Sequence, residues 1–174
     1  MLRRNKIRGL LPAAGALTTA EPKDKMMPMP DWNELTLFAI ALAEASATAI
    51  LPNFRRNTEV EDKGAAIFDP VTEGDRAGER AIRRMIEDRY PDHGIHGEEY
   101  GIKDTGSPFT WVLDPVDGTR AFVCGMPTWA TLIGLAYEVR PVVGLMNQPV
   151  VGDMFYGNPN GAWHSYRGFA QPIR

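Results

Sequence analysis

The carboxyl-terminal part of the chain is a run of short strand patterns, and this run restricts the possible folds more than any other feature. Segments 109–114, 130–138, 140–149, 151–157 and 161–165 are apolar or alternating, and turns rich in Gly, Pro and Asn separate them. Short turns between strands favour antiparallel pairing. Two helical patterns precede the run, and that order is typical of an α+β fold. We therefore predict two helices packed on a mostly antiparallel sheet.

The first helix is predicted over residues 31–51. Asp31 can cap its start, Glu34 follows three residues later, and apolar residues recur at helical spacing. Pro52 is expected to end it, because the residue before a proline is disfavoured in helical conformation.

A second helix is predicted over about residues 73–89, and its arginines are interpreted as a solvated face. A loop with a short strand near 94–96 is expected to follow. The apolar residues that share one face of the second helix are Ala77, Ala81, Ile82, Met85 and Ile86.

Residues 1–30 differ in composition from the rest of the 174-residue chain. They begin basic, become rich in Ala and Leu, and end rich in Pro and Met. A targeting peptide is one interpretation, and a translation start at Met26, Met27 or Met29 is another. We interpret 1–30 as a disordered or artefactual leader and 31–174 as one domain, which is long enough to bury a core.

Charge and cysteine content exclude some classes of protein. After residue 25 the chain holds thirteen Lys or Arg against twenty acidic residues, and this acidic balance argues against nucleic acid as a partner. No apolar run is expected to reach the roughly 20 residues of a membrane helix. The single cysteine, Cys124, forms no intrachain disulfide, fits a cytoplasmic location and is interpreted as a small apolar residue rather than a reactive thiol.

The remaining rare residues carry no predicted chemistry. The three histidines are interpreted as plain polar residues of loops or strand edges rather than as bases, and three tryptophans as core residues rather than a stacking platform. They are His93, His96 and His164, and Trp111, Trp129 and Trp163.

Acidic residues recur beside Gly or Pro turns rather than on regular solvent faces. Each motif alone is compatible with a solvated surface charge. Taken together, they supply the oxygen ligands that Mg²⁺ prefers, one or two carboxylates with phosphate oxygens completing the shell. These acids are Asp69, Asp75, Glu98, Glu99, Asp114 and Asp117.

The segment "WVLDPVDGTRAF", residues 111–122, brings these elements together. Asp114 and Asp117 straddle a proline-led turn after a strand, so both side chains and the Val116 carbonyl can converge. Gly118 allows close approach to a ligand. A helix beginning at Thr119 would direct backbone N–H groups at an anion. Metal ligands beside a phosphate cradle predict metal-assisted hydrolysis of a phosphate ester.

Three motifs resemble those of the inositol monophosphatase family of Mg²⁺-dependent sugar and polyol phosphatases. "DPVTEGD" matches Asp-x-x-Thr-x-x-Asp, "GEEYG" contains Gly-Glu-Glu, and "DPVDGT" matches Asp-Pro-[Ile/Val]-Asp-Gly-Thr. The resemblance runs from about residue 31 to 174. The continuation "RAFVCGMPTWATLIGLAYEVRPVVGLMNQP" is similar to the histidinol-phosphatase branch. The implied fold is the amino-terminal domain of that family's layered sandwich.

The resemblance also implies a metal site. Glu98, Asp114 and the Val116 carbonyl would hold one Mg²⁺, and Asp114 and Asp117 would share a second. Glu98 would orient the attacking water through a third, weaker ion, so two or three ions are expected. The implied reaction is in-line attack of a metal-activated water on phosphorus, without a covalent enzyme intermediate.

Further roles follow from the same resemblance. Thr119 and Asp75 would act as a catalytic pair that polarises a water, and the N–H groups of Gly118 and Thr119 would bind phosphate. Arg120, directly after the phosphate loop, could touch substrate or a subunit partner. The supporting residues would be Lys63, Thr72 and Glu99.

From these residues we predict a Mg²⁺-dependent phosphomonoesterase that hydrolyses a small phosphorylated metabolite. L-Histidinol phosphate, of histidine biosynthesis, is the favoured substrate, and inositol phosphate or another sugar phosphate is the alternative. Family members are often dimeric, so a homodimer is considered. They also continue into a second domain with a Trp-Asp motif, which this sequence lacks. The alternative from another class is therefore an inactive, truncated metal-binding remnant that pairs with a partner chain.

Overall fold

The computed structural model describes residues 30–56, 60–62 and 70–173. The chain divides into two units, Met1–Pro30 and Asp31–Arg174, and every element described below belongs to the second. The leader predicted for residues 1–30 lies outside the described residues except for Pro30. Its interpretation remains a prediction.

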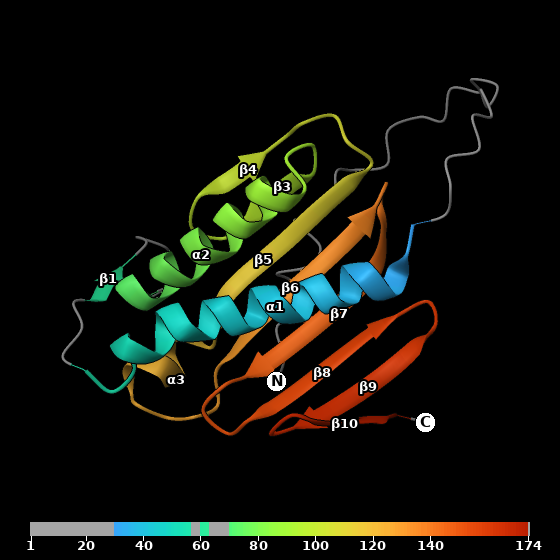
Figure 1. The fold of residues 1–174 in the computed structure, drawn as a ribbon. Coiled ribbons are helices and arrows are strands. Elements are labelled where there is room, and N and C mark those ends of the chain that lie inside the picture. The colour runs from blue at the N-terminus through green and yellow to red at the C-terminus, as the bar shows by residue number, and fades with distance from the viewer. Residues whose placement is uncertain (1–29, 57–59, 63–69, 174) are drawn as a thin grey trace. The chain divides into compact units, whose positions relative to one another are not determined.

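An eight-stranded sheet forms the centre of the described unit (Figure 1), in the order β10-β9-β8-β7-β6-β5-β3-β4. Neighbouring strands are antiparallel except for the parallel pair β3–β5. This arrangement confirms the predicted α+β class. The strands are β3 Gly94–Gly97, β4 Gly101–Lys103, β5 Phe109–Asp117, β6 Ala130–Tyr137, β7 Arg140–Gln148, β8 Asp153–Asn158, β9 Gly161–Tyr166 and β10 Phe169–Pro172. A separate antiparallel pair joins β1 Val60–Asp62 to β2 Pro70–Thr72.

Helix α1, Trp32–Ile50, begins as the sequence predicts. The Asp31 carboxylate accepts hydrogen bonds from the backbone N–H groups of Asn33 and Glu34, which satisfies two of the donors at the helix start. The Glu34 carboxylate accepts instead from Arg89 Nη2 at 2.8 Å and from the Tyr90 hydroxyl at 3.0 Å. The start of α1 is thereby tied to the end of the second helix, and Pro52 lies in a short 3₁₀ helix, η1 Leu51–Asn53.

The apolar character of α1 departs from expectation. Among the described residues, Trp32–Asn53 is long and apolar enough to cross a membrane by length and composition, so the prediction that no segment reaches this threshold is wrong. The same properties are found in helices buried in a globular core. Here Leu35, Ala39, Leu42 and Ala43 lie in the main core cluster, and that packing accounts for the apolar sequence.

Helix α2, Glu73–Arg89, has the predicted bounds, and Ile82 and Ile86 are fully buried on its inner face. The interpretation of its arginines as a solvated face is wrong for Arg83, whose side chain is only 14% exposed and pairs with the fully buried Glu79. A charged pair on the inner face of a helix is not recognisable from apolar periodicity alone.

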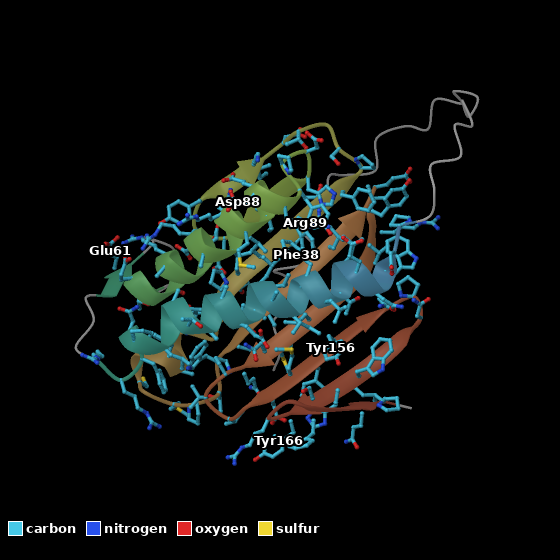
Figure 2. The ribbon with its side chains drawn as sticks, viewed as in Figure 1. Phe38, Glu61, Asp88, Arg89, Tyr156 and Tyr166 are labelled. Atoms are coloured by element: carbon cyan, nitrogen blue, oxygen red, sulfur yellow. The ribbon has the colours of Figure 1, made fainter. Side chains whose placement is uncertain are left out.

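Both helices lie on one face of the sheet (Figure 1), and the main core fills the space between. Phe38 of α1, labelled in Figure 2, packs edge-on against Tyr90 and against Trp111 of β5, with centroid distances of 5.0 and 5.6 Å. A second cluster contains Ile50, Val116, Phe122 and Trp129. Trp111 and Trp129 are thus core residues, as predicted, and Trp163 is half-buried on β9.

Candidate functional site

The two aspartates of "DPVDG" lie within β5, which continues through Asp117. The sequence predicted a turn after residue 114, and the structure shows instead a shift in the β5–β6 register between Asp114 and Asp117. Pro115 has no N–H to donate to the ladder, and its carbonyl accepts from the Thr131 hydroxyl at 2.8 Å. The irregularity leaves Asp114 half-buried and Asp117 exposed.

Glu98 is placed beside Asp114 by the parallel pairing of β3 and β5. Gly97 is the register partner of Leu113, and the backbone N–H of Glu98 donates to the Leu113 carbonyl at 3.2 Å. Glu98 is the first residue after β3, and Asp114 is the next residue along β5. Two carboxylates 16 positions apart in the sequence therefore leave adjacent strands at the same level.

Asp75 and Thr119 are brought together from α2 and from the segment after β5. The Thr119 hydroxyl lies 3.4 Å from Asp75 Oδ1 and 3.0 Å from the Val116 carbonyl. Asp75 is 3% exposed, and its Oδ2 accepts from the Thr72 N–H at 2.8 Å and from the Thr72 hydroxyl at 2.6 Å. These two bonds fix the orientation of the carboxylate beside Thr119.

Gly118 carries the chain from β5 into helix α3, Thr119–Val123, which begins at the residue the sequence predicts. The φ angle of Gly118 is 95°, which lies in the left-handed region that favours glycine. A Cβ at this position would lie 3.4 Å from the Thr128 carbonyl oxygen. Arg120, the next residue but one, is exposed.

The donors offered by this region are oxygen atoms of hard-cation type. Three of the donors belong to the last residues of β5, namely Asp114, the Val116 carbonyl and Asp117. The fourth, Glu98, follows β3 directly. Within the described part of the chain, no three Asp, Glu, His or Cys side chains converge as a ready metal cluster. Carboxylates repel one another without a cation between them, and Mg²⁺ is held by one or two carboxylates with water and phosphate. The donor set fits such an ion in chemistry and in strand position.

The supporting residues have different outcomes. Thr72 caps α2, its hydroxyl accepting from the Gly74 N–H at 3.1 Å. Glu99 follows Glu98 in the turn after β3, and its N–H donates to Glu79 Oε2 at 2.7 Å. Lys63 and Asp69 lie outside the described residues, so their predicted places remain predictions.

Glu79 was given no role from the sequence, although it sits under the Gly-Glu-Glu turn. Its side chain is fully buried, and its carboxylate contacts the backbone of that turn. The available signal was helical spacing: Glu79 follows Asp75 by four residues and precedes Ile82 by three, so it lies on the inner face.

The histidines lie in other surroundings. His93 stacks on Tyr90 and Phe109, and its Nδ1 accepts from Trp111 Nε1 at 3.1 Å. Burial lowers the pKa of His93, against a smaller opposing effect of Asp92. His93 is thus part of an aromatic cluster rather than a plain polar loop residue. His164 Nε2 lies 2.8 Å from Asp153 Oδ1, and Cys124, at the end of α3, is exposed.

Comparison with known proteins identifies relatives along most of the chain. Residues 31–173 match the family model described as "Inositol monophosphatase family". A histidinol-phosphatase of Streptomyces coelicolor is 42% identical over 129 residues, which are 71% of this chain and 47% of that protein. A chloroplastic bifunctional phosphatase, IMPL2, of Arabidopsis thaliana is 40% identical over 129 residues, 71% of this chain and 37% of that protein.

Solved structures agree with the fold. The Thermotoga maritima IMPase superposes with a TM-score of 0.71 at 27% identity, covering 82% of this chain and 53% of that one. An inositol monophosphatase from Zymomonas mobilis gives a TM-score of 0.65 at 34% identity, covering 83% and 55%. The chain thus spans about half the length, or less, of the relatives it matches.

Proposed function

Because this chain belongs to the inositol monophosphatase family, a family of metal-dependent phosphatases, we propose that it carries a Mg²⁺-dependent phosphomonoesterase site that hydrolyses L-histidinol phosphate. The observation that supports this most directly is the contact of Thr119 with Asp75, beside the adjacent carboxylates Glu98 and Asp114. Two or three Mg²⁺ ions and a cytoplasmic location are part of the proposal.

Residues of this chain would carry out proton transfer and phosphate binding. Asp75, oriented by its two bonds from Thr72, would accept the Thr119 proton. The Thr119 oxygen can then accept a proton from a water and orient it toward phosphorus. The N–H groups of Gly118 and Thr119 would hold a phosphate oxygen.

Glu98, Asp114, Asp117 and the Val116 carbonyl would hold the metal. When bound, Mg²⁺ supplies positive charge that polarises the phosphate oxygens and a water. The water oxygen would bond to phosphorus as the P–O bond of the ester breaks, which gives an alcohol and inorganic phosphate. The departing ester oxygen would take its proton from solvent water, and Asp75 would return the proton it received to solvent, so the protons balance.

The choice of substrate is supported by the relatives. Histidinol-phosphatases of Streptomyces coelicolor and Chlorobaculum parvum are 42% and 37% identical to this chain. Inositol monophosphatase 3 of Solanum lycopersicum, at 36%, keeps inositol phosphate as the alternative substrate.

Phosphate release by the purified chain tests the proposal, with histidinol phosphate and inositol 1-phosphate as substrates. Release should need Mg²⁺, stop with EDTA, fall strongly in Asp114→Asn, and be faster with histidinol phosphate. Faster release from inositol phosphate would change the substrate. EDTA-resistant release would overturn the metal-dependent mechanism.

A second candidate function is a metal-binding domain that works with a partner polypeptide. On the sheet face away from α1 and α2, Leu132, Met146 and Phe155 are register neighbours on β6, β7 and β8. Phe155 is 37% exposed there. Among the described elements, no helix covers this face, and relatives are about twice as long as the matched region.

Complementation tests this candidate. The matching half of the Streptomyces coelicolor histidinol-phosphatase would be deleted and its remaining half mixed with this chain. Release of phosphate only by the mixture would support the partner proposal. Equal release by this chain alone would overturn it.

A further inference from the structure

We propose that Glu79 is a positioning residue that fixes the turn carrying Glu98, and so sets the affinity of the site for its divalent cation. This inference rests on the proposed function, because it takes Glu98 as a metal ligand. It concerns a different residue, which contacts the backbone of the turn rather than the substrate or the metal.

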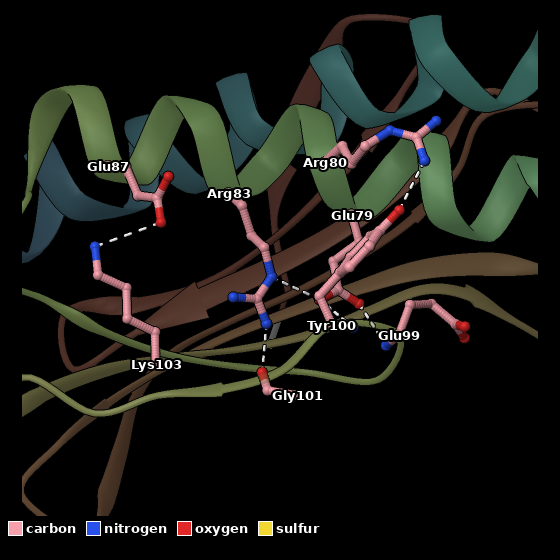
Figure 3. Close-up of polar contacts among 8 residues, drawn as sticks. All are labelled: Glu79, Arg80, Arg83, Glu87, Glu99, Tyr100, Gly101 and Lys103. Atoms are coloured by element: carbon pink, nitrogen blue, oxygen red, sulfur yellow. Dashed lines mark hydrogen bonds and ion pairs between the residues drawn. The ribbon is translucent and has the colours of Figure 1, made fainter.

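Glu79 is a buried carboxylate that accepts hydrogen bonds from three donors (Figure 3). Its side chain is 0% exposed. Oε2 accepts from the Glu99 N–H at 2.7 Å, and Oε1 accepts from the Tyr100 N–H at 3.1 Å and from Arg83 Nε at 2.7 Å. Burying a charge is costly unless partners compensate it. Here two of the three partners are backbone groups of one turn.

Arg83 completes the attachment from the same helix. Its Nε binds Glu79, and its Nη2 donates to the Gly101 carbonyl at the end of the turn. Glu79 therefore accepts from the N–H groups of residues 99 and 100, and Arg83 donates to the carbonyl of residue 101. Figure 3 shows both groups extending from α2 onto this segment.

The fit between the turn and Glu79 is close on the β3 side as well. A Cβ built on Gly97 would lie 1.8 Å from Glu79 Oε1 and 2.8 Å from Arg83 Nη2. Only glycine allows the strand to approach the carboxylate in this way.

Glu98 lies between these two fixed points. Gly97 before it is in contact with the Glu79 carboxylate, and Glu99 after it donates to the same carboxylate. Its own N–H is bonded to Leu113, next to Asp114. Movement of the turn would therefore change the distance between Glu98 and Asp114 directly. Groups that orient metal ligands from behind typically change metal affinity by about 10–100-fold when they are replaced.

The decisive variant is Glu79→Gln, which keeps the size of the side chain but turns one acceptor into a donor facing an N–H. Its control is Glu87→Gln, on the same helix, whose partner is Lys103 of β4 at 3.4 Å rather than the turn. Mn²⁺ alone is the probe, and the fall of its free-ion electron paramagnetic resonance signal gives the dissociation constant without any reaction.

We expect Glu79→Gln to bind Mn²⁺ at least about 10-fold more weakly and Glu87→Gln to bind like wild type. Excess Mg²⁺ should then restore most of the phosphate release by Glu79→Gln, since the residue acts through the metal. Equal Mn²⁺ affinity of Glu79→Gln and wild type, with both folded, would overturn the inference, as would lost activity that excess metal leaves unrestored.

If Glu79→Gln does not fold, Arg83→Lys decides the question. It keeps a cation beside Glu79 but removes the donor to Gly101, so weaker Mn²⁺ binding supports the inference and unchanged binding overturns it. Tight Mn²⁺ binding by a wild type that releases no phosphate would end the proposed function and leave this inference standing. A wild-type chain that binds no Mn²⁺ would overturn this inference. Phosphate release measured with Mg²⁺ and with EDTA would then test the proposed function separately.

Discussion

The Thr119 hydroxyl lies 3.4 Å from Asp75 Oδ1, although 44 positions separate the two residues. Asp75 lies in the first turn of α2 and Thr119 is the first residue of α3, so the contact forms only when α2 is docked on the end of β5. Asp75 is also bound by both Thr72 donors, which fix the orientation of its carboxylate.

Replacing Thr119 by Val should reduce phosphate release by about 10²-fold or more, because Val keeps the shape of Thr but has no hydroxyl to take a proton. Thr119→Ser is the matched control and should retain release within several-fold. The measurement is kcat for histidinol phosphate at saturating Mg²⁺. Similar rates for the Val and Ser variants would show that the hydroxyl takes no part in the reaction.

The Asp75→Asn substitution should affect both stability and activity. It removes the charge that Thr72 stabilises with two hydrogen bonds, and we expect a loss of about 1–2 kcal/mol in the free energy of unfolding. Groups that act as a unit are non-additive in their kinetic effects. The double variant Asp75→Asn, Thr119→Val should thus be hardly slower than Thr119→Val, whereas a multiplied loss of rate would separate the two roles.

Gly97→Ala should destabilise the protein by about 3 kcal/mol or more, since the new Cβ would meet a buried carboxylate that cannot move aside without breaking its bonds. Gly144→Ala on β7 is the control, because a Cβ there has nothing within 4 Å. Urea unfolding of both variants tests this. A Gly97→Ala midpoint close to that of Gly144→Ala would contradict the close fit of β3 on Glu79.

Stability should fall in acid partly through His93. Its pKa is lowered in the folded state, so the unfolded chain binds the proton more readily. The contribution of neutral His93 to the free energy of unfolding is full above the ordinary histidine pKa, about 6.5. It is lost as the pH falls through the lower pKa that His93 has in the folded protein.

The variant His93→Gln tests this, because Gln can still accept from Trp111 but does not titrate. It should be less stable than wild type at pH 7.5, by about 1 kcal/mol for the lost ring stacking, and the difference should narrow at pH 5. Parallel pH profiles of the free energy of unfolding would rule out the role of His93.

Periodicity was sufficient to predict α1, α2 and the long strands, because their apolar residues face one core. It could not predict β4, which has three residues, or β10, whose residues are all exposed. At the site, the motifs predicted roles for Asp75, Glu98, Asp114 and Thr119, and those roles stay predictions; the structure brings Asp75 to Thr119 and places Glu98 next to the strand position of Asp114. The fit of the turn on Glu79 was not predictable, since it depends on the long-range approach of α2 to β3.

The order of the strands has a consequence for how the molecule opens. From β5 to β10 every strand pairs with its neighbour in sequence. Short loops join the strands from β6 to β10, so the contacts of this meander are mostly local. Asp75 and Glu79 reach the sheet from α2, outside the meander. Partial opening that releases α2 would therefore dismantle the site while the meander stays paired. We expect amide hydrogens of α2 and of the turn after β3 to exchange faster than those of β6 and β7, with exchange at the site preceding global unfolding.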